Sequence, residues 1–252
     1  MFSHLLTPEA SLPSGVGFSL FGPGHLSALT GSLGLILLLL LVFRRQPAPL
    51  QNRLMKVLSV SMVFLELVKD LILAVLGAFS VGYLPLHLCS LSMFVCLYYA
   101  WHPDSSAAGH ILYSVVLPGA LCALLFPNWT KFPLLHFQSL HSFLYHTLLV
   151  LFSLMPVVFG RCRPGLRGIG PSLLFLLGVS IPVGLLNLLL GTNYMFLRGP
   201  SNGSPLEALA VLPGRFGYLL GYFLLVLAVL ILLNLPFTLL RFLRRRKGHG
   251  RV

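Results

Sequence analysis

The chain has 252 residues, of which 57% are hydrophobic and only 9% are charged, and its mean hydropathy is +0.92. Soluble domains carry about 25% charged residues, so this composition excludes a soluble globular protein and predicts a polytopic membrane protein. The formal net charge of +12 does not indicate a nucleic-acid partner. Most Lys and Arg residues stand in three clusters beside apolar segments, where they would meet anionic lipid headgroups.

Seven apolar segments predict an all-α, polytopic membrane helix bundle with seven transmembrane helices in the cell membrane. An α-helix needs roughly 20 apolar residues to cross a bilayer. In chain order, the segments cover about residues 25–43, 57–79, 85–101, 109–126, 135–159, 171–190 and 216–240. We divide the chain into an N-terminal outer loop or interfacial segment (1–24), the transmembrane bundle (25–240) and a basic tail (241–252). The first span is expected to act as the targeting signal, because no basic stretch with a small-residue cleavage site precedes it.

The basic clusters predict how this bundle is oriented. They lie at residues 44–56, 161–167 and 241–251, after the first, fifth and seventh segments. With seven spans, all three clusters fall on one side of the membrane, which the positive-inside rule identifies as the cytoplasm. We therefore expect the N-terminus outside and the C-terminus in the cytoplasm, with anionic lipid headgroups bound at the basic loops and tail.

The second segment carries three charged residues, Glu66, Lys69 and Asp70. Residues three or four apart are neighbours on a helix, and charges inside a membrane usually survive by pairing. One interpretation is therefore an internal ion pair that allows the helix to insert. The other is a polar cavity in which Asp70 or Glu66 orients a histidine.

The third segment opens with a polar stretch that contains His87 and Cys89. On a helix, residues two apart point about 200° away from each other, so His87 is not expected to act as the base for Cys89. An intramembrane cysteine is more often a packing residue than a nucleophile. Cys89 differs from the other cysteines in its depth, because it lies about one helical turn inside the predicted outer boundary.

The fifth segment is unusually polar, with His136, Gln138, His141 and His146 close together. Packing alone does not explain so many polar groups in one span, so the segment predicts a functional cavity. No cysteine or carboxylate stands at ligand spacing beside these histidines, and we expect neither a metal nor another cofactor.

The predicted topology gathers further polar residues in the outer half of the bundle. His25 begins the first span, and Asn193 and Tyr194 follow the sixth. Acyl transfer needs a nucleophile, a base, a group that orients the base, and donors for the oxyanion. These four roles could be filled in turn by Cys89, by His146, by Asp70 or Glu66, and by Asn193 or Tyr194. A cysteine in apolar surroundings keeps its proton unless a histidine or a cation stabilises the thiolate, so Cys89 must touch a histidine.

Three motifs together resemble the bacterial YwaF family of integral membrane proteins: Leu86 to Ser90, Pro133 to His146, and Asn193 to Leu197. That family is similar to the eukaryotic transmembrane protein 164 family and, more distantly, to the androgen-induced membrane hydrolases. The resemblance implies a membrane-embedded lipid acyltransferase or hydrolase. It also implies a cysteine nucleophile at Cys89, where the distant hydrolases have threonine, and a catalytic histidine at His146. His141 departs from the pattern, because many bacterial members are expected to carry glutamine there.

The leading hypothesis is acyl transfer or ester hydrolysis on a membrane lipid, through an acyl thioester on Cys89 with His146 as base and then acid. The residues expected to bind substrate or support this pair are His25, His87, Gln138, His141, Asn193, Tyr194, Asp70 and Glu66. The main alternative is a transporter or solute-binding membrane subunit with a polar cavity open to the outer side. Internal repeats typical of many transporters are not found in the sequence. A purely structural or assembly protein is the third alternative.

Overall fold

The computed structural model describes residues 4–201 and 203–249, with backbone only at 245–249. Within these residues every regular element is a helix, which confirms the all-α prediction. The remainder of the predicted basic tail, at residues 250–252, lies outside the described residues.

The long helices follow the predicted segments closely. They are α1 (Pro23–Phe43), α2 (Ala48–Val75), α3 (Leu88–Trp101), α4 (Ser106–Ile111), α5 (Leu117–Leu125), α6 (Phe137–Val158), α7 (Ile169–Leu190) and α8 (Gly214–His249). The π-helical turn η3 (Leu112–Val116) joins α4 to α5. The short 3₁₀ helices are η1 (Glu9–Ser11), η2 (Val81–Tyr83), η4 (Leu166–Gly168), η5 (Tyr194–Phe196) and η6 (Pro205–Val211).

In the described part of the chain, six helical segments are long and apolar enough to cross a membrane, which makes this a multi-pass membrane protein. The predicted second span corresponds to α2, which is not among the six because its charged residues lower its apolar character. At 28 residues and about 1.5 Å per residue, α2 is nevertheless longer than the bilayer core is thick. Seven spans therefore stay a prediction.

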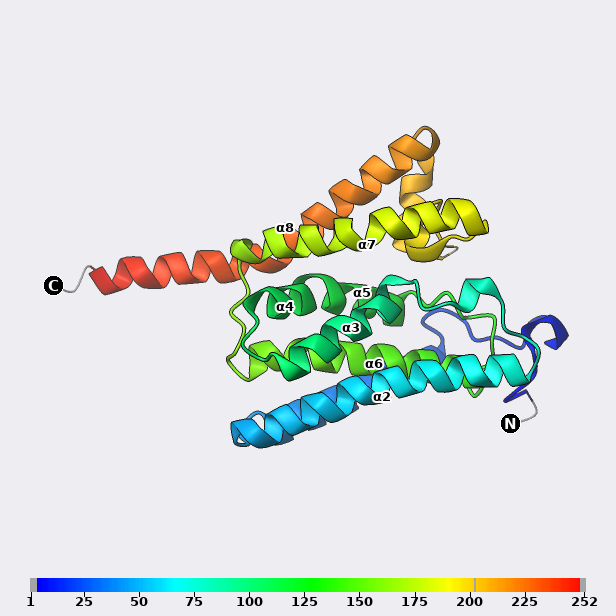
Figure 1. The fold of residues 1–252 in the computed structure, drawn as a ribbon, viewed down its shortest axis with the longest axis horizontal. Helices are drawn as coiled ribbons and strands as arrows, with labels where there is room; N and C mark the ends of the chain where they lie inside the picture. The colour runs from blue at the N-terminus through cyan, green and yellow to red at the C-terminus, as the bar shows by residue number, and fades with distance from the viewer. Residues whose placement is uncertain (1–3, 202, 250–252) are drawn as a thin grey trace.

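Successive helices run in opposite directions, so the loops gather at two ends of the bundle (Figure 1). We call the end with the N-terminal segment and residues 76–87, 126–136 and 191–213 the loop end. The opposite end, which we call the arginine end, carries residues 44–47, 159–165 and the described part of the C-terminal tail, residues 241–249 (Figure 1). The three basic clusters thus lie at one end of the bundle, as expected. Which side of the membrane this end faces stays a prediction.

Helix α6 forms the centre of the fold and packs against α1, α2, α3 and α5. Its side chains Leu149, Leu151, Phe152 and Met155 are fully buried. Helices α7 and α8 pack on the other side of α4, η3 and α5, and α8 bends midway along its length (Figure 1). Pro236 lies inside α8, and a proline ring kinks a helix because it removes a backbone hydrogen bond.

Candidate functional site

A cavity of about 500 Å³ lies towards the loop end, between α3, α5 and α6 on one side and α8 on the other. Its volume falls in the range typical of small-molecule sites. The polar residues that line it include Glu66, Lys69, His87, Ser90, Gln138, His141, Ser142, Tyr145 and His146. They come from α2, from the start of α3 and from α6. The residues contributed by α5 and α8 are mostly apolar, so the cavity is polar at one side and apolar at the other.

Cys89 and His146 line this same cavity, although they are far apart in the sequence. Helix α3 supplies Cys89 in its first turn, and α6 supplies His146. The Tyr145 hydroxyl donates a hydrogen bond to the Cys89 carbonyl at 3.4 Å, which ties the two helices together beside the pair. In the described structure no hydrogen bond joins the Cys89 thiol to the His146 ring.

The His146 ring is held in one tautomer. Its Nδ1 lies 2.7 Å from the Ser142 carbonyl, and a carbonyl only accepts hydrogen bonds, so Nδ1 carries the proton and Nε2 carries the lone pair. The Trp129 indole stacks on the imidazole, with ring centroids 5.2 Å apart. A histidine fixed in this way can accept a proton at Nε2.

The charged residues of α2 form an ion-pair cluster at the cavity wall. Lys69 Nζ lies 2.7 Å from Glu66 Oε1 and 3.2 Å from Asp70 Oδ1, so the predicted internal ion pair is present. Glu66 Oε1 also accepts a hydrogen bond from the Ser90 hydroxyl at 3.1 Å. Its second oxygen, Oε2, lies 3.8 Å from His141 Nε2. Glu66 thus faces His141, and Asp70 faces Lys69.

His87 precedes α3 with an extended backbone, so the angle predicted for two residues of one helix does not apply, and His87 and Cys89 both line the cavity. His87 stands at the N-cap of α3, and its ring packs edge-on against Tyr194 with centroids 5.3 Å apart. The Met195 N–H donates to His87 Nδ1 at 3.4 Å. His87 therefore connects the cavity wall to the turn that follows α7.

His25 and His136 serve to join segments of the fold. Each is almost fully buried. His25 Nε2 donates to the Leu124 carbonyl at 2.8 Å, and its Nδ1 accepts from the Phe21 N–H. His136 Nε2 donates to the Thr7 carbonyl at 3.0 Å. Because both nitrogens of His25 are occupied by backbone groups and its ring does not line the cavity, its role in the structure is packing.

Asn193 and Tyr194 shape the turn after α7, and their neighbours Met195 and Phe196 line the cavity. The Asn193 amide donates to the Gly199 carbonyl at 2.9 Å, and the Tyr194 hydroxyl donates to the Val81 carbonyl. Met195 and Phe196 have positive φ values of 56° and 55°. Non-glycine residues rarely adopt this conformation unless their surroundings impose it.

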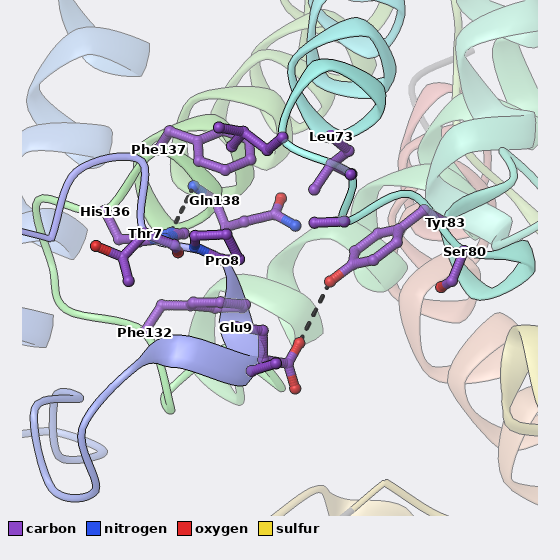
Figure 2. Close-up of a pocket in the computed structure, with 14 residues that line it drawn as sticks. Thr7, Pro8, Glu9, Leu73, Ser80, Tyr83, Phe132, His136, Phe137 and Gln138 are labelled. Carbon is purple, nitrogen blue, oxygen red and sulfur yellow. Dashed lines mark hydrogen bonds between the residues drawn. The ribbon is translucent and has the colours of Figure 1, made fainter.

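A second pocket, of about 340 Å³, adjoins the cavity at the loop end. The N-terminal segment forms one wall, and Tyr83 reaches across to donate a hydrogen bond to Glu9 at 3.3 Å (Figure 2). Glu9 also forms an ion pair with Lys131. Tyr83, Phe132 and Gln138 line both pockets, so Gln138 lies between the N-terminal segment and the larger cavity.

Three further residues shape the site without having been predicted to do so from the sequence: Ser90, Trp129 and Asn187. Ser90 stands in the motif that contains Cys89, and its polarity inside a span was the available signal. Asn187 is fully buried, and its amide holds the Tyr194 backbone at both the N–H and the carbonyl. A lone asparagine in an apolar segment was a comparable signal. Nothing in the sequence indicated that Trp129 would stack on His146.

In the described residues, no group of three or more His, Cys, Asp or Glu side chains is placed to hold a metal ion.

The chain was compared with known proteins in three ways. A family model described as the TMEM164 family matches residues 20–234, a range that includes Cys89, His146 and the cavity. The searches of curated proteins and of solved structures find no match.

Proposed function

The chain belongs to the TMEM164 family, and from this premise we propose that it transfers or hydrolyses a fatty-acyl group of a membrane lipid through a thioester on Cys89. The observation that carries the proposal is the shared cavity, which is lined by the Cys89 thiol, by the His146 imidazole and by an apolar wall. A lipid ester has the same division into polar and apolar parts. The likeness to the YwaF family and to the androgen-induced hydrolases stays a prediction.

The first half-reaction is the acylation of Cys89. The thiol proton moves to His146 Nε2, and the thiolate attacks the ester carbonyl of the lipid. A C–S bond forms as the C–O bond breaks, and His146 returns the proton to the departing alkoxide. In the second half-reaction, the hydroxyl of an acceptor lipid or of water gives its proton to His146 and attacks the thioester. The sulfur then leaves and recovers the proton from His146.

The first turn of α3 offers donors for the oxyanion. A helix leaves its first N–H groups without partners inside the helix, and those of Leu88, Cys89 and Ser90 make no hydrogen bond in the described structure, whereas the Leu91 N–H bonds to the His87 carbonyl. The partial positive charge of this helix terminus favours a developing oxyanion beside Cys89. We propose these groups as the donors instead of Asn193 and Tyr194, whose polar side-chain atoms bond to the backbone of the loops.

The missing hydrogen bond between Cys89 and His146 is compatible with this mechanism, because catalytic hydrogen bonds are often long in a free enzyme and tighten when substrate binds. The Tyr145 link keeps α3 and α6 in register. Glu66 and Ser90 support the wall next to the nucleophile.

The test is covalent labelling of the purified protein with an alkyne fatty-acyl donor. We expect a hydroxylamine-sensitive adduct that disappears in Cys89→Ala and falls at least tenfold in His146→Ala. Cys162→Ala is the matched control, because Cys162 is a free cysteine at the arginine end that does not line the cavity and should label like the wild type. Undiminished labelling of Cys89→Ala would overturn the nucleophile assignment.

A transporter remains the second candidate, because the charged residues Glu66 and Lys69 line the cavity. Solute uptake into proteoliposomes would then depend on these two residues and tolerate Cys89→Ser. The same substitution should strongly reduce labelling and turnover if the protein is an acyltransferase. The two functions therefore predict opposite results for one variant.

We also propose that α2 is a seventh span, that the loop end faces the outside and that the arginine end faces the cytoplasm, where its basic residues contact anionic lipid headgroups. In intact cells, a membrane-impermeant maleimide should label a cysteine placed at Ser80, next to the pocket of Figure 2. A cysteine placed at Arg163 should react only after the cells are opened. The reverse pattern would contradict this orientation.

A further inference from the structure

The apolar side of the cavity continues as a slot between two helices. The α5 wall includes Gly119 and Cys122, and the α8 wall includes Tyr222, Val226 and Val229. At about 1.5 Å per residue, the cavity-lining stretch of α8 runs roughly 12 Å along the bundle from Tyr222 to Leu230. The slot therefore leads from the polar side, where Cys89 lies, towards the arginine end.

The inner end of this slot is closed by a buried polar contact. The Asn234 amide donates to the Ser114 hydroxyl at 2.9 Å and to the Leu230 carbonyl at 2.8 Å. Its carbonyl oxygen accepts from the Gly165 N–H at 2.9 Å. Asn234 is fully buried, and Leu230 is 1% exposed. Because the Asn234 amide is satisfied within the protein, these residues form a firm floor, at which the Ser114 hydroxyl already accepts one hydrogen bond.

We propose that the slot binds one unbranched fatty-acyl chain and that its floor, at Ser114 and Leu230, limits the chain length. This inference rests on the proposed function and adds the determinant of its substrate. An acyl chain suits the slot because the residues that line it on α5 and α8 are mostly apolar, and because the carbonyl end of the chain then lies beside Cys89. A polar solute that entered the slot would lose its hydrogen bonds to water and to the polar side of the cavity. Burying its polar groups against apolar walls without new partners would cost free energy.

Gly119 offers a way to shorten the slot without disturbing the helix around it. A Cβ atom at this position would meet Leu88 Cδ2 at 3.7 Å, an ordinary van der Waals contact. Gly119→Ala should therefore fold normally, and the longer side chain of Gly119→Leu should extend into the slot. Leu121 of the same helix is 40% exposed and does not line the cavity. Leu121→Phe is therefore the matched control for added bulk on α5.

The experiment uses fatty acids that carry a photoreactive diazirine at the methyl end and an alkyne for detection, in a short, a medium and a long saturated form. They are crosslinked to the full-length protein in nanodiscs, and the crosslinked residues are mapped by mass spectrometry. We expect the crosslinks to move from the Tyr222 region towards Leu230 as the chain lengthens. Gly119→Leu should lower crosslinking of the long probe at least fivefold and leave the short probe unchanged, and Gly119→Ala should have a smaller effect in the same direction.

Two results would overturn the slot assignment. One is crosslinking spread over membrane-facing residues with no dependence on chain length, and the other is an equal loss in Leu121→Phe and Gly119→Leu. The crosslinking is repeated in Cys89→Ala. Non-covalent binding of the fatty acid does not need the thiol, so the crosslinks should persist in this variant. If the crosslinks persist and no thioester forms on the wild type, the slot stands and the proposed catalysis fails. If the thioester forms and the crosslinks show no length dependence, catalysis stands and the slot assignment fails.

Discussion

The Tyr145 hydroxyl donates a hydrogen bond to the backbone carbonyl of Cys89 at 3.4 Å. Tyr145 is buried and immediately precedes His146 on α6, so this contact connects the proposed nucleophile to the segment that carries the proposed base. The Tyr145 ring also packs edge-on against the His146 ring, with centroids 5.9 Å apart. A single tyrosine thereby fixes the spacing of the two helices at the point where the chemistry would take place.

Tyr145→Phe should keep the ring packing and remove only this hydrogen bond. A neutral hydrogen bond contributes about 1 kcal/mol, which corresponds to about a fivefold change in rate if the contact is needed in the transition state. We expect thioester formation to slow by about that factor in a single-turnover assay, with little change in the stability of the purified protein. Tyr98→Phe, at a 52% exposed position on α3, is the control. Acylation at the wild-type rate in Tyr145→Phe would show that the link is not needed for catalysis.

Glu66→Gln should destabilise the protein, because Lys69 would lose its closer carboxylate partner. Removing one member of a buried ion pair typically costs about 3–5 kcal/mol, and Asp70, which lies 3.2 Å from Lys69, should reduce that cost. We expect a lower midpoint of thermal unfolding in detergent, and partial recovery in Glu66→Gln/Lys69→Met, where no cation is left with a missing partner.

The double variant also separates the two interpretations of the cluster. If the cluster only helps α2 to insert, stability and acylation should recover together. If Glu66 supports the cavity wall through Ser90 and His141, stability should recover and acylation should stay low. A double variant less stable than Glu66→Gln would contradict the ion-pair explanation.

The sequence allows the helices to be predicted because long apolar runs, Arg clusters and prolines are local features. The density of polar residues in two spans also predicts that Cys89 and His146 lie in the same half of the bundle, and both line one cavity; their pairing as nucleophile and base is implied by the family resemblance and stays a prediction. The partners of those polar residues depend on tertiary packing, which local patterns do not encode. His25 bonds to Leu124, for example, and the Asn193 side chain bonds to its own loop. The slot between α5 and α8 likewise depends on how distant helices pack.

Glu9→Gln should loosen the N-terminal segment while having little effect on global stability. Glu9 and Lys131 form an ion pair whose side chains are 46% and 54% exposed, and exposed pairs contribute at most about 1 kcal/mol. Tyr83 would still find an acceptor in the glutamine amide. We expect faster hydrogen–deuterium exchange in residues 5–12 and an unchanged unfolding midpoint. Glu207→Gln, at the other acidic loop residue of the loop end, should leave exchange in residues 5–12 unaltered, and a large drop in global stability on Glu9→Gln would contradict the expectation.

Acidification should loosen the start of α6 through His136. Burial lowers the pKa of His136 below its usual value of 6.5, so the folded protein binds this proton less readily than the unfolded chain does. The neutral ring donates a hydrogen bond from Nε2 to the Thr7 carbonyl and accepts one at Nδ1 from the Gln138 N–H. Protonation of Nδ1 removes the bond from Gln138 and leaves the bond to Thr7. The stability that His136 contributes is therefore fully present above about pH 6.5 and declines as the pH falls towards the lowered pKa. We expect hydrogen–deuterium exchange in residues 137–140, at the start of α6, to rise between about pH 6.5 and pH 5 after correction for its intrinsic pH dependence. His136→Gln should remove this pH dependence, and a pH response that survives the substitution would assign it to another group.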